Sequence, residues 1–157
     1  MASRRKGRIL AFQALYSWDA HYRDAEDASI PEGLLDFSWT GSGTPLDEKM
    51  AAFSRLIVTG TIENIASVDH VIKEHLENWE LKRLNRVDLA VLRMSVYTLM
   101  FQGDMPPSVV INEAVEICKE FGADDSYRFV NGVLDSIRIA LAGSSPKQDA
   151  TYPMIQK

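Results

Sequence analysis

Apolar residues recur every three or four positions along most of the chain, which is the spacing of one face of an α-helix. This spacing occurs over residues 9–20, 50–77, 87–101, 110–121 and 129–141. No segment shows a convincing strand alternation, and no internal repeat is evident. The sequence therefore predicts an all-α fold.

Breaks in the pattern give the expected element boundaries. Residues 22–45 mix acids, Gly and Pro around a short apolar patch, so we expect a short helix at 30–37 and then a mobile loop. Thr44 and Pro45 are typical of a helix start, because Thr accepts free backbone N–H groups and Pro suits the first helical position. Gly60 lies inside the helix that follows, which predicts a bend or break there.

The segment 87–101 is apolar on most of its faces, which predicts a central, buried helix. Residues 124–126 can cap the last helix. Gly132 lies inside that helix, where glycine costs about 1 kcal/mol relative to alanine, and such a site usually marks close contact with another helix. Residues 143–157 are expected to form a flexible tail.

Length and composition limit the class of protein. The chain has 157 residues, of which 46% are hydrophobic and 25% charged, enough for one core or two small contiguous ones. No apolar run approaches the roughly 18 to 20 residues of a membrane span, and the N-terminus lacks an apolar signal core. The single cysteine, Cys118, cannot form an internal disulfide. We expect a cytoplasmic protein.

Charge is distributed unevenly along the chain. The net charge is −5, yet residues 1–8 hold Arg4, Arg5, Lys6 and Arg8 and no acid, which leaves 13 basic against 22 acidic residues elsewhere. A segment of charge +4 on a body of −9 is typical of an interaction arm. A disordered, solubilising tail is the alternative, but the apolar spacing that starts at residue 9 places these cations on the first turns of a helix.

Groups that would support catalysis are not evident in the sequence. Cys118 falls on an apolar helical stripe, which favours a buried small side chain over a nucleophile. Glu113, Glu116 and Glu120 share one helical face and are interpreted as a solvated acidic stripe. The sequence shows no metal motif, phosphate loop or dinucleotide fingerprint. We therefore expect no enzyme activity, no metal and no cofactor.

An RNA-binding function has more support. Guanidinium groups bind phosphates and aromatic faces stack on unpaired bases. Tyr16 follows Arg8 by eight residues on the same predicted helix and therefore lies on a similar face. Ordinary core packing is the alternative interpretation of Tyr16.

A series of short motifs occurs in a fixed order along the chain. They are RRKGR at 4–8, AFQALY at 11–16, RL at 83–84, VDLAVLR at 87–93, Pro106, VINEA at 110–114, FG at 121–122 and FVNGVLD at 129–135. Each motif is weak alone, but in this order and spacing they resemble the NusB family. The resemblance covers nearly the whole chain outside residues 22–45 and the tail.

The resemblance implies two perpendicular three-helix bundles forming one compact unit, at about 1–77 and 78–142. It also implies binding of boxA RNA from ribosomal RNA leader transcripts together with NusE, a small-subunit ribosomal protein, in an antitermination complex with RNA polymerase. The RNA-side candidates are Arg4, Arg5, Lys6, Arg8, Tyr16, Asp88, Asp125 and Phe129. Phosphate repels Asp125, so this residue either accepts a hydrogen bond from a base edge or caps the last helix.

Other positions receive structural roles or differ from the family. Asn112, Asn131 and Gly132 are assigned to the framework, and Arg93 and Glu113 are candidate members of ion pairs. Thr98 stands where the family commonly has glutamate, a change that affects a partner contact. Gly7 stands where alanine is common, which would weaken the first helical turn.

Two alternative functions remain open at this point. One is an accessory RNA-binding domain related to the N-terminal domains of ribosomal RNA methyltransferases, although this sequence has no glycine-rich cofactor loop. The other is a structural homodimer, suggested by the apolar helices and by dimers in the family.

Overall fold

A computed structural model describes the helical body of the protein, over residues 2–25, 27–37, 39, 47–77 and 79–143. The helices are α1 (Ala2–Ala25), α2 (Glu48–Glu63), α3 (Ile65–Glu74), α4 (Arg86–Phe101), α5 (Pro107–Phe121) and α6 (Ser126–Gly143), with 3₁₀ turns η1 (Leu34–Asp36) and η3 (Leu81–Arg83). These ranges contain no strand, so the all-α prediction is confirmed for them. The expected tail lies outside the described residues, except Gly143, which ends α6.

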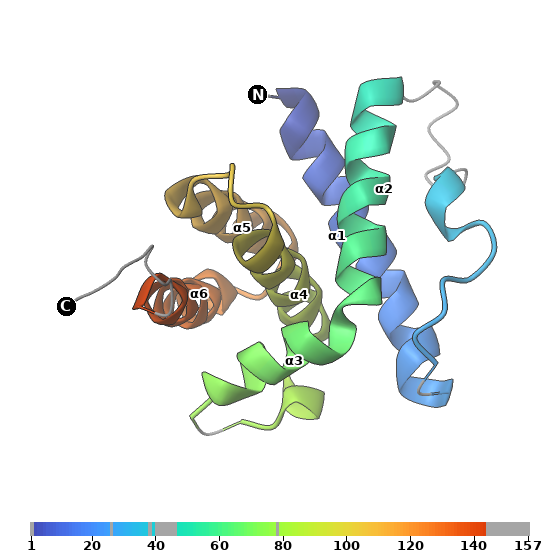
Figure 1. Cartoon of the computed structure of the whole chain (residues 1–157). Helices are drawn as coiled ribbons and strands as arrows, with labels where there is room; N and C mark the ends of the chain where they lie inside the picture. Colours follow the sequence, from blue (N-terminus) through green and yellow to red (C-terminus); the bar gives the residue numbers. More distant parts are fainter. Residues whose placement is uncertain (1, 26, 38, 40–46, 78, 144–157) are drawn as a thin grey trace.

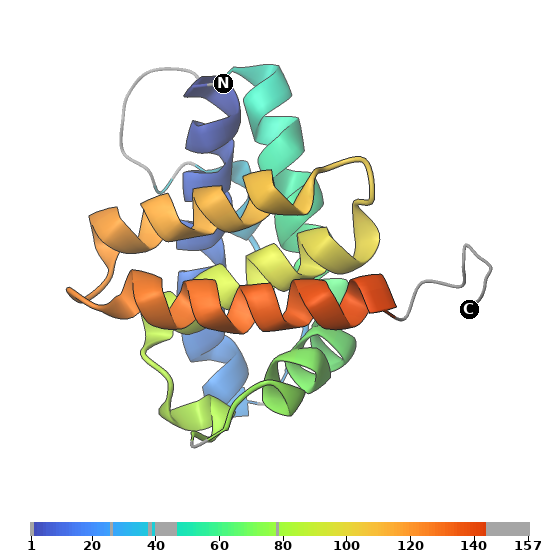
Figure 2. The same cartoon turned by 90° about the vertical axis from the view of Figure 1, so that its left-hand side faces the viewer.

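The helices run in two main directions. α1 and α2 lie side by side and run the same way (Figure 1). α5 and α6 lie side by side in opposite directions and cross the direction of α1 and α2 (Figure 2). No described helix is long and apolar enough to cross a membrane.

Helix α4 is the centre of the fold. It packs against α1, α2, α3, α5 and α6, and each of its residues from Asp88 to Thr98 is buried. Its start is fixed by Asn85, whose side chain accepts a hydrogen bond from the Val87 N–H at 2.8 Å. The central, buried helix predicted from the sequence is confirmed.

Two of the predicted elements have different boundaries in the structure. Helix α2 begins at Glu48 because Asp47 caps it, accepting a hydrogen bond from the Met50 N–H at 3.2 Å. The start predicted at residues 44–45 lies outside the described residues. The short helix expected at 30–37 is only the 3₁₀ turn η1, whose C-terminal cap Phe37 has a φ of 58°.

The bend predicted at Gly60 is wrong. The break between α2 and α3 falls at Asn64, whose backbone and side-chain N–H groups both donate to the Gly60 carbonyl, at 3.1 and 2.8 Å. Gly60 instead allows close approach of α4, since a Cβ there would overlap the ring and hydroxyl of Tyr97. Helix α2 therefore needs glycine at this position for packing and not for a change of direction.

Two further glycines differ from expectation. A Cβ on Gly132 would meet nothing within 4 Å, so the prediction of a close helix contact there is wrong. Gly7 is buried, and a Cβ there would lie 2.7 Å from the Phe53 ring of α2. The Gly7 carbonyl accepts a hydrogen bond from the Ser54 hydroxyl at 2.8 Å. Gly7 thus brings the basic turn of α1 against α2.

A buried ionic network joins α1, α3 and α4. Arg93 is 3% exposed and donates to Asp19 at 2.7 Å and to both oxygens of Asp69 at 2.9 and 3.0 Å. Burial disfavours the Arg93 charge, but the two carboxylates outweigh it and raise the pKa of Arg93. The expectation that Arg93 forms an ion pair is confirmed.

Candidate nucleic-acid interface

The basic arm is the first two turns of α1, and its four cations have different environments. Arg4, Arg5 and Lys6 are exposed, whereas Arg8 is buried. The Arg4 guanidinium lies over the Phe53 ring, 4.9 Å from its centroid. The arm is therefore a helical surface packed on α2, as its apolar spacing predicts.

Arg5 is held by an acid from a distant part of the chain. Its Nε and Nη2 donate to the two carboxylate oxygens of Glu113 on α5, at 3.1 and 2.9 Å. The hydrogen bond from Arg5 lowers the pKa of Glu113. The Glu113 side chain is 15% exposed, so its assignment to a solvated stripe is wrong, and its membership of an ion pair is confirmed. Any phosphate that binds Arg5 competes with this carboxylate.

Arg8 lies inside the junction of α1, α2 and α5. Its guanidinium is 3.7 Å from Glu113, contacts the Met105 sulfur at 3.6 Å, and lies 5.5 Å from the Phe53 ring centroid. Desolvation by burial lowers the pKa of Arg8. The arm thus exposes Arg4 and Lys6 and shares Arg5 with Glu113, while Arg8 is packed in this structure.

Tyr16 lies on the surface two turns further along α1. It is 38% exposed and makes an edge contact with Phe12, at 6.4 Å between ring centroids. The guanidinium of Arg86, the first residue of α4, lies 4.6 Å from the Tyr16 ring centroid. Tyr16 is therefore a surface aromatic residue with a cation on one face.

The three remaining candidates, Asp88, Asp125 and Phe129, line one pocket of about 540 Å³ between η3, the start of α4 and the start of α6. Exposed Trp79 and Arg83 line it too. Sequence reasoning missed Trp79, whose only signal is a large aromatic residue in a predicted turn. The pocket brings residues at 79–88 close to residues at 123–129, because α4 and α6 pack together.

Asp88 is the chemically unusual group in this pocket. It is 7% exposed, and its Oδ1 atom is buried with no hydrogen-bond partner among the described residues. Burial raises the pKa of Asp88, and a hydrogen bond with Ser126 opposes that shift. An unpaired buried carboxylate oxygen is costly, so a donor that enters the pocket gains a strong acceptor.

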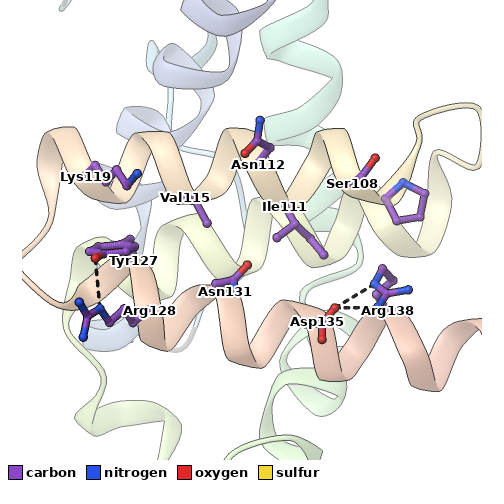
Figure 3. A pocket seen from close by; sticks show the side chains of 11 residues that line it. Ser108, Ile111, Asn112, Val115, Lys119, Tyr127, Arg128, Asn131, Asp135 and Arg138 are labelled. Atoms are coloured by element: carbon purple, nitrogen blue, oxygen red, sulfur yellow. Dashed lines mark hydrogen bonds and ion pairs between the residues drawn. The ribbon is translucent and has the colours of Figure 1, made fainter.

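A second concave surface runs between α5 and α6. Its volume is about 820 Å³, and its lining includes Asn112, Lys119, Arg128 and Asn131 (Figure 3). The nearby guanidinium groups are engaged locally: Arg128 with the Tyr127 hydroxyl at 3.1 Å and Arg138 with Asp135 at 2.7 Å. None of the RNA-side candidates lines this groove. The sequence does not reveal it because it depends on the antiparallel packing of two helices.

The described residues offer no group of three or more His, Cys, Asp or Glu side chains able to hold a metal ion. Cys118 is fully buried in α5, as its apolar stripe predicts. Desolvation and the nearby Asp88 carboxylate raise the pKa of its thiol to about 12. At neutral pH this thiol is protonated and therefore a poor nucleophile.

Cys118 is expected to resist alkylation in the folded protein. At pH 8, iodoacetamide should leave the native thiol unmodified over a period in which the urea-unfolded chain reacts fully, because only the thiolate reacts and burial suppresses it. Mass spectrometry of the quenched samples measures both rates. Equal rates in the native and unfolded samples would contradict the buried position.

Comparisons with known proteins give a consistent result. The model of the NusB family matches residues 5–138. The transcription antitermination protein NusB of Treponema denticola is 51% identical over 135 residues, which cover 86% of this chain and 95% of the relative.

Solved structures are similar to this chain over most of its length. A T. maritima NusB structure is 37% identical with a TM-score of 0.73, and the match covers 87% of this chain and 90% of the other. A structure of antitermination factors NusB and NusE in complex with dsRNA is 26% identical with a TM-score of 0.75, covering 89% and 98%.

Proposed function

Since the chain belongs to the NusB family, we propose that it is a transcription antitermination factor that binds boxA RNA of ribosomal RNA leader transcripts together with NusE. In this role it promotes processive ribosomal RNA transcription as part of an antitermination complex with RNA polymerase. The observation that carries the proposal is the pairing of a helical basic arm with an aromatic pocket lined by Asp88, whose buried Oδ1 atom has no hydrogen-bond partner among the described residues.

The arm supplies the phosphate contacts in this proposal. Arg4 and Lys6 are exposed, and Arg5 is half exposed beside Glu113. Contacts of this kind give affinity that depends on salt and not on sequence, because they release counterions from the RNA backbone. Arg8 positions the arm from inside the junction with α5.

The pocket supplies the contacts to bases. Trp79 is 58% exposed and Phe129 is half-buried, and both offer faces on which unpaired bases stack. The free Asp88 oxygen and the exposed Asp125 carboxylate accept hydrogen bonds from the amino groups on base edges. Both carboxylates repel phosphate, so the pocket favours a base over the backbone.

NusE is proposed to complete the RNA site. The chain has a net charge of −5, and one arm cation is paired with Glu113 while another is buried. Such a surface binds RNA modestly by itself. The relative solved with NusE and dsRNA supports an assembly of this composition.

The proposal is tested by fluorescence polarisation of boxA RNA and a scrambled RNA, each titrated with the protein in the presence and absence of NusE. We expect NusE to tighten binding to boxA by at least about tenfold over the scrambled RNA, since base contacts then add to phosphate contacts. Equal, weak binding to both RNAs with NusE present would exclude this function.

Replacing Arg4 and Lys6 together with alanine is expected to flatten the salt dependence of RNA binding. The slope of log K against log salt should fall by about 1.4, which is about 0.7 for each phosphate that the variant no longer neutralises on single-stranded RNA. The matched control is Lys49→Ala with Arg55→Ala on α2, a pair of cations outside the arm. A slope that the arm variant leaves unchanged would show that these cations do not contact phosphates.

A further inference from the structure

A second group of cations surrounds the buried carboxylate of Asp19 on α1. Asp19 is 1% exposed, and its two oxygens receive Arg93 at 2.7 Å, Arg23 at 2.8 Å and Arg86 at 3.4 Å. Asp69 is the other acid in the network and binds Arg93. The network therefore has three guanidinium groups and two carboxylates, a net charge of +1. Arg23 and Arg86 are its solvent-exposed members, whereas Arg93 is buried.

Arg23 and Arg86 both reach the surface from this network, and each is held by Asp19 and by a backbone carbonyl. The Arg86 side chain is 39% exposed, its Nε faces Asp19, and its Nη2 donates to the Tyr16 carbonyl at 3.1 Å. Its Cζ atom lies over the Tyr16 ring, 4.6 Å from the ring centroid. Nη1 makes no hydrogen bond with the described residues, so its two N–H groups are available to a ligand.

Further cations lie beside Arg86. Arg23 donates to the Lys82 carbonyl at 3.3 Å, which brings the end of α1 against η3. The side chains of Lys82 and Arg83 are exposed. This basic cluster of Arg23, Lys82, Arg83 and Arg86 comes from three elements, and its members are up to 63 residues apart in the sequence.

The cluster lies between the two halves of the proposed RNA surface. Arg86 covers Tyr16, which lies two turns beyond the arm on α1, whereas its chain neighbour Asn85 and nearby Arg83 line the pocket of Asp88 and Phe129. The carboxylates of that pocket repel phosphate. A strand that places a base in the pocket must therefore carry its backbone outside it. Arg83 lines the pocket, and Arg86 follows the lining residue Asn85 in the chain.

We infer that Arg86 is a further RNA-contact residue, which binds the backbone phosphate between a nucleotide at Tyr16 and the base held in the pocket. This inference rests on the proposed function and assigns the path of the RNA across the molecule. A guanidinium anchored by Asp19 and Tyr16 loses little side-chain entropy when it binds phosphate, which favours this residue over a freely moving lysine.

The test compares the RNA affinity of Arg86→Gln with that of Arg55→Gln. Binding of boxA RNA is titrated in the presence of NusE over a range of salt concentrations, which gives the slope of log K against log salt for each variant. Arg55 is a close match: it is 40% exposed, pairs with Glu48 at 3.5 Å, donates to the Leu35 carbonyl at 3.0 Å and lies 5.9 Å from the Phe37 ring centroid. We expect Arg86→Gln to lower the salt slope by about 0.7 and Arg55→Gln to leave it unchanged.

Arg86→Lys keeps the charge and loses the planar group. We expect it to restore most of the slope but to reduce ultraviolet cross-linking of RNA at Tyr16, because the ring loses the guanidinium that holds it. Circular dichroism and thermal unfolding check that Arg86→Gln is folded, since Asp19 keeps Arg93 and Arg23 as partners.

The inference and the proposed function fail in different ways. If wild-type protein prefers boxA with NusE, and Arg4→Ala lowers the slope while folded Arg86→Gln does not, then Arg86 is not on the RNA path and the inference is overturned. If wild-type protein shows no boxA preference, the proposed function fails. A lower slope for Arg86→Gln on scrambled RNA would still support a phosphate contact at this position.

Discussion

Replacing Arg93 with alanine is expected to lower the free energy of unfolding by about 3–5 kcal/mol, the usual cost of removing one partner from a buried ion pair. Asp69 would lose its bidentate guanidinium and with it its charge compensation, whereas Asp19 would lose its shortest contact but keep Arg23 and Arg86. A typical domain has a total stability of about 5–15 kcal/mol. The variant should therefore be close to unfolding at physiological temperature.

Urea unfolding followed by circular dichroism measures this loss. The control is Arg138→Ala on α6, which removes an exposed i,i+3 pair with Asp135 and should cost less than about 0.5 kcal/mol. A double replacement of Arg93 and Asp69 by uncharged residues of similar size should recover part of the stability, because fewer buried charges remain unpaired. A cost for Arg93→Ala as small as that of Arg138→Ala would contradict the buried network.

Gly60→Ala is expected to destabilise the protein by about 1–3 kcal/mol, the range for overpacking a well-packed core. The added methyl group would overlap the Tyr97 ring. Tyr97 is 7% exposed and packs beside Phe101, at 5.5 Å between ring centroids, so the ring has little room to move. The intrinsic preference of alanine for helices opposes this cost but is smaller.

Gly132→Ala is the matched control and should change stability in the opposite direction. The new methyl group meets nothing within 4 Å, so the substitution should stabilise α6 by about 0.5–1 kcal/mol through helix propensity alone. Thermal unfolding of the two variants beside wild type measures both changes. Destabilisation by both alanines to the same extent would mean that helix contact does not distinguish the two positions.

The sequence predicts the helices well because their pattern is local. The apolar spacing identifies α4 as the central helix, and α6 begins at Ser126, inside the predicted capping segment 124–126. The two glycine predictions that were wrong depend on where other helices lie. Gly60 was interpreted as a bend because no local pattern reveals that Tyr97 lies above it, and Gly132 as a contact because no local pattern reveals open space.

In the candidate site, too, the sequence predicts the features that depend on local residues and misses those that depend on packing between helices. Local charge identified the arm, but it did not predict that Glu113 holds Arg5 or that Arg8 is buried. The resemblance to a family supplied Asp88, Asp125 and Phe129 as separate positions, and the packing of α4 against α6 places them in one pocket. The only signal of Trp79 was a large aromatic residue in a predicted turn, and Arg86 carried none, since their roles depend on neighbours from other elements.

The contact between Arg5 and Glu113 spans 108 positions, and that between Asp19 and Arg93 spans 74. During synthesis the chain emerges from its N-terminus, so α1 leaves the ribosome long before α4 and α5 exist to hold it. Contacts of such high sequence separation form late and slowly. The arm is thus made first but gains its final shape last, and a nascent or truncated chain that ends before α5 carries the cations without the surface that orders them.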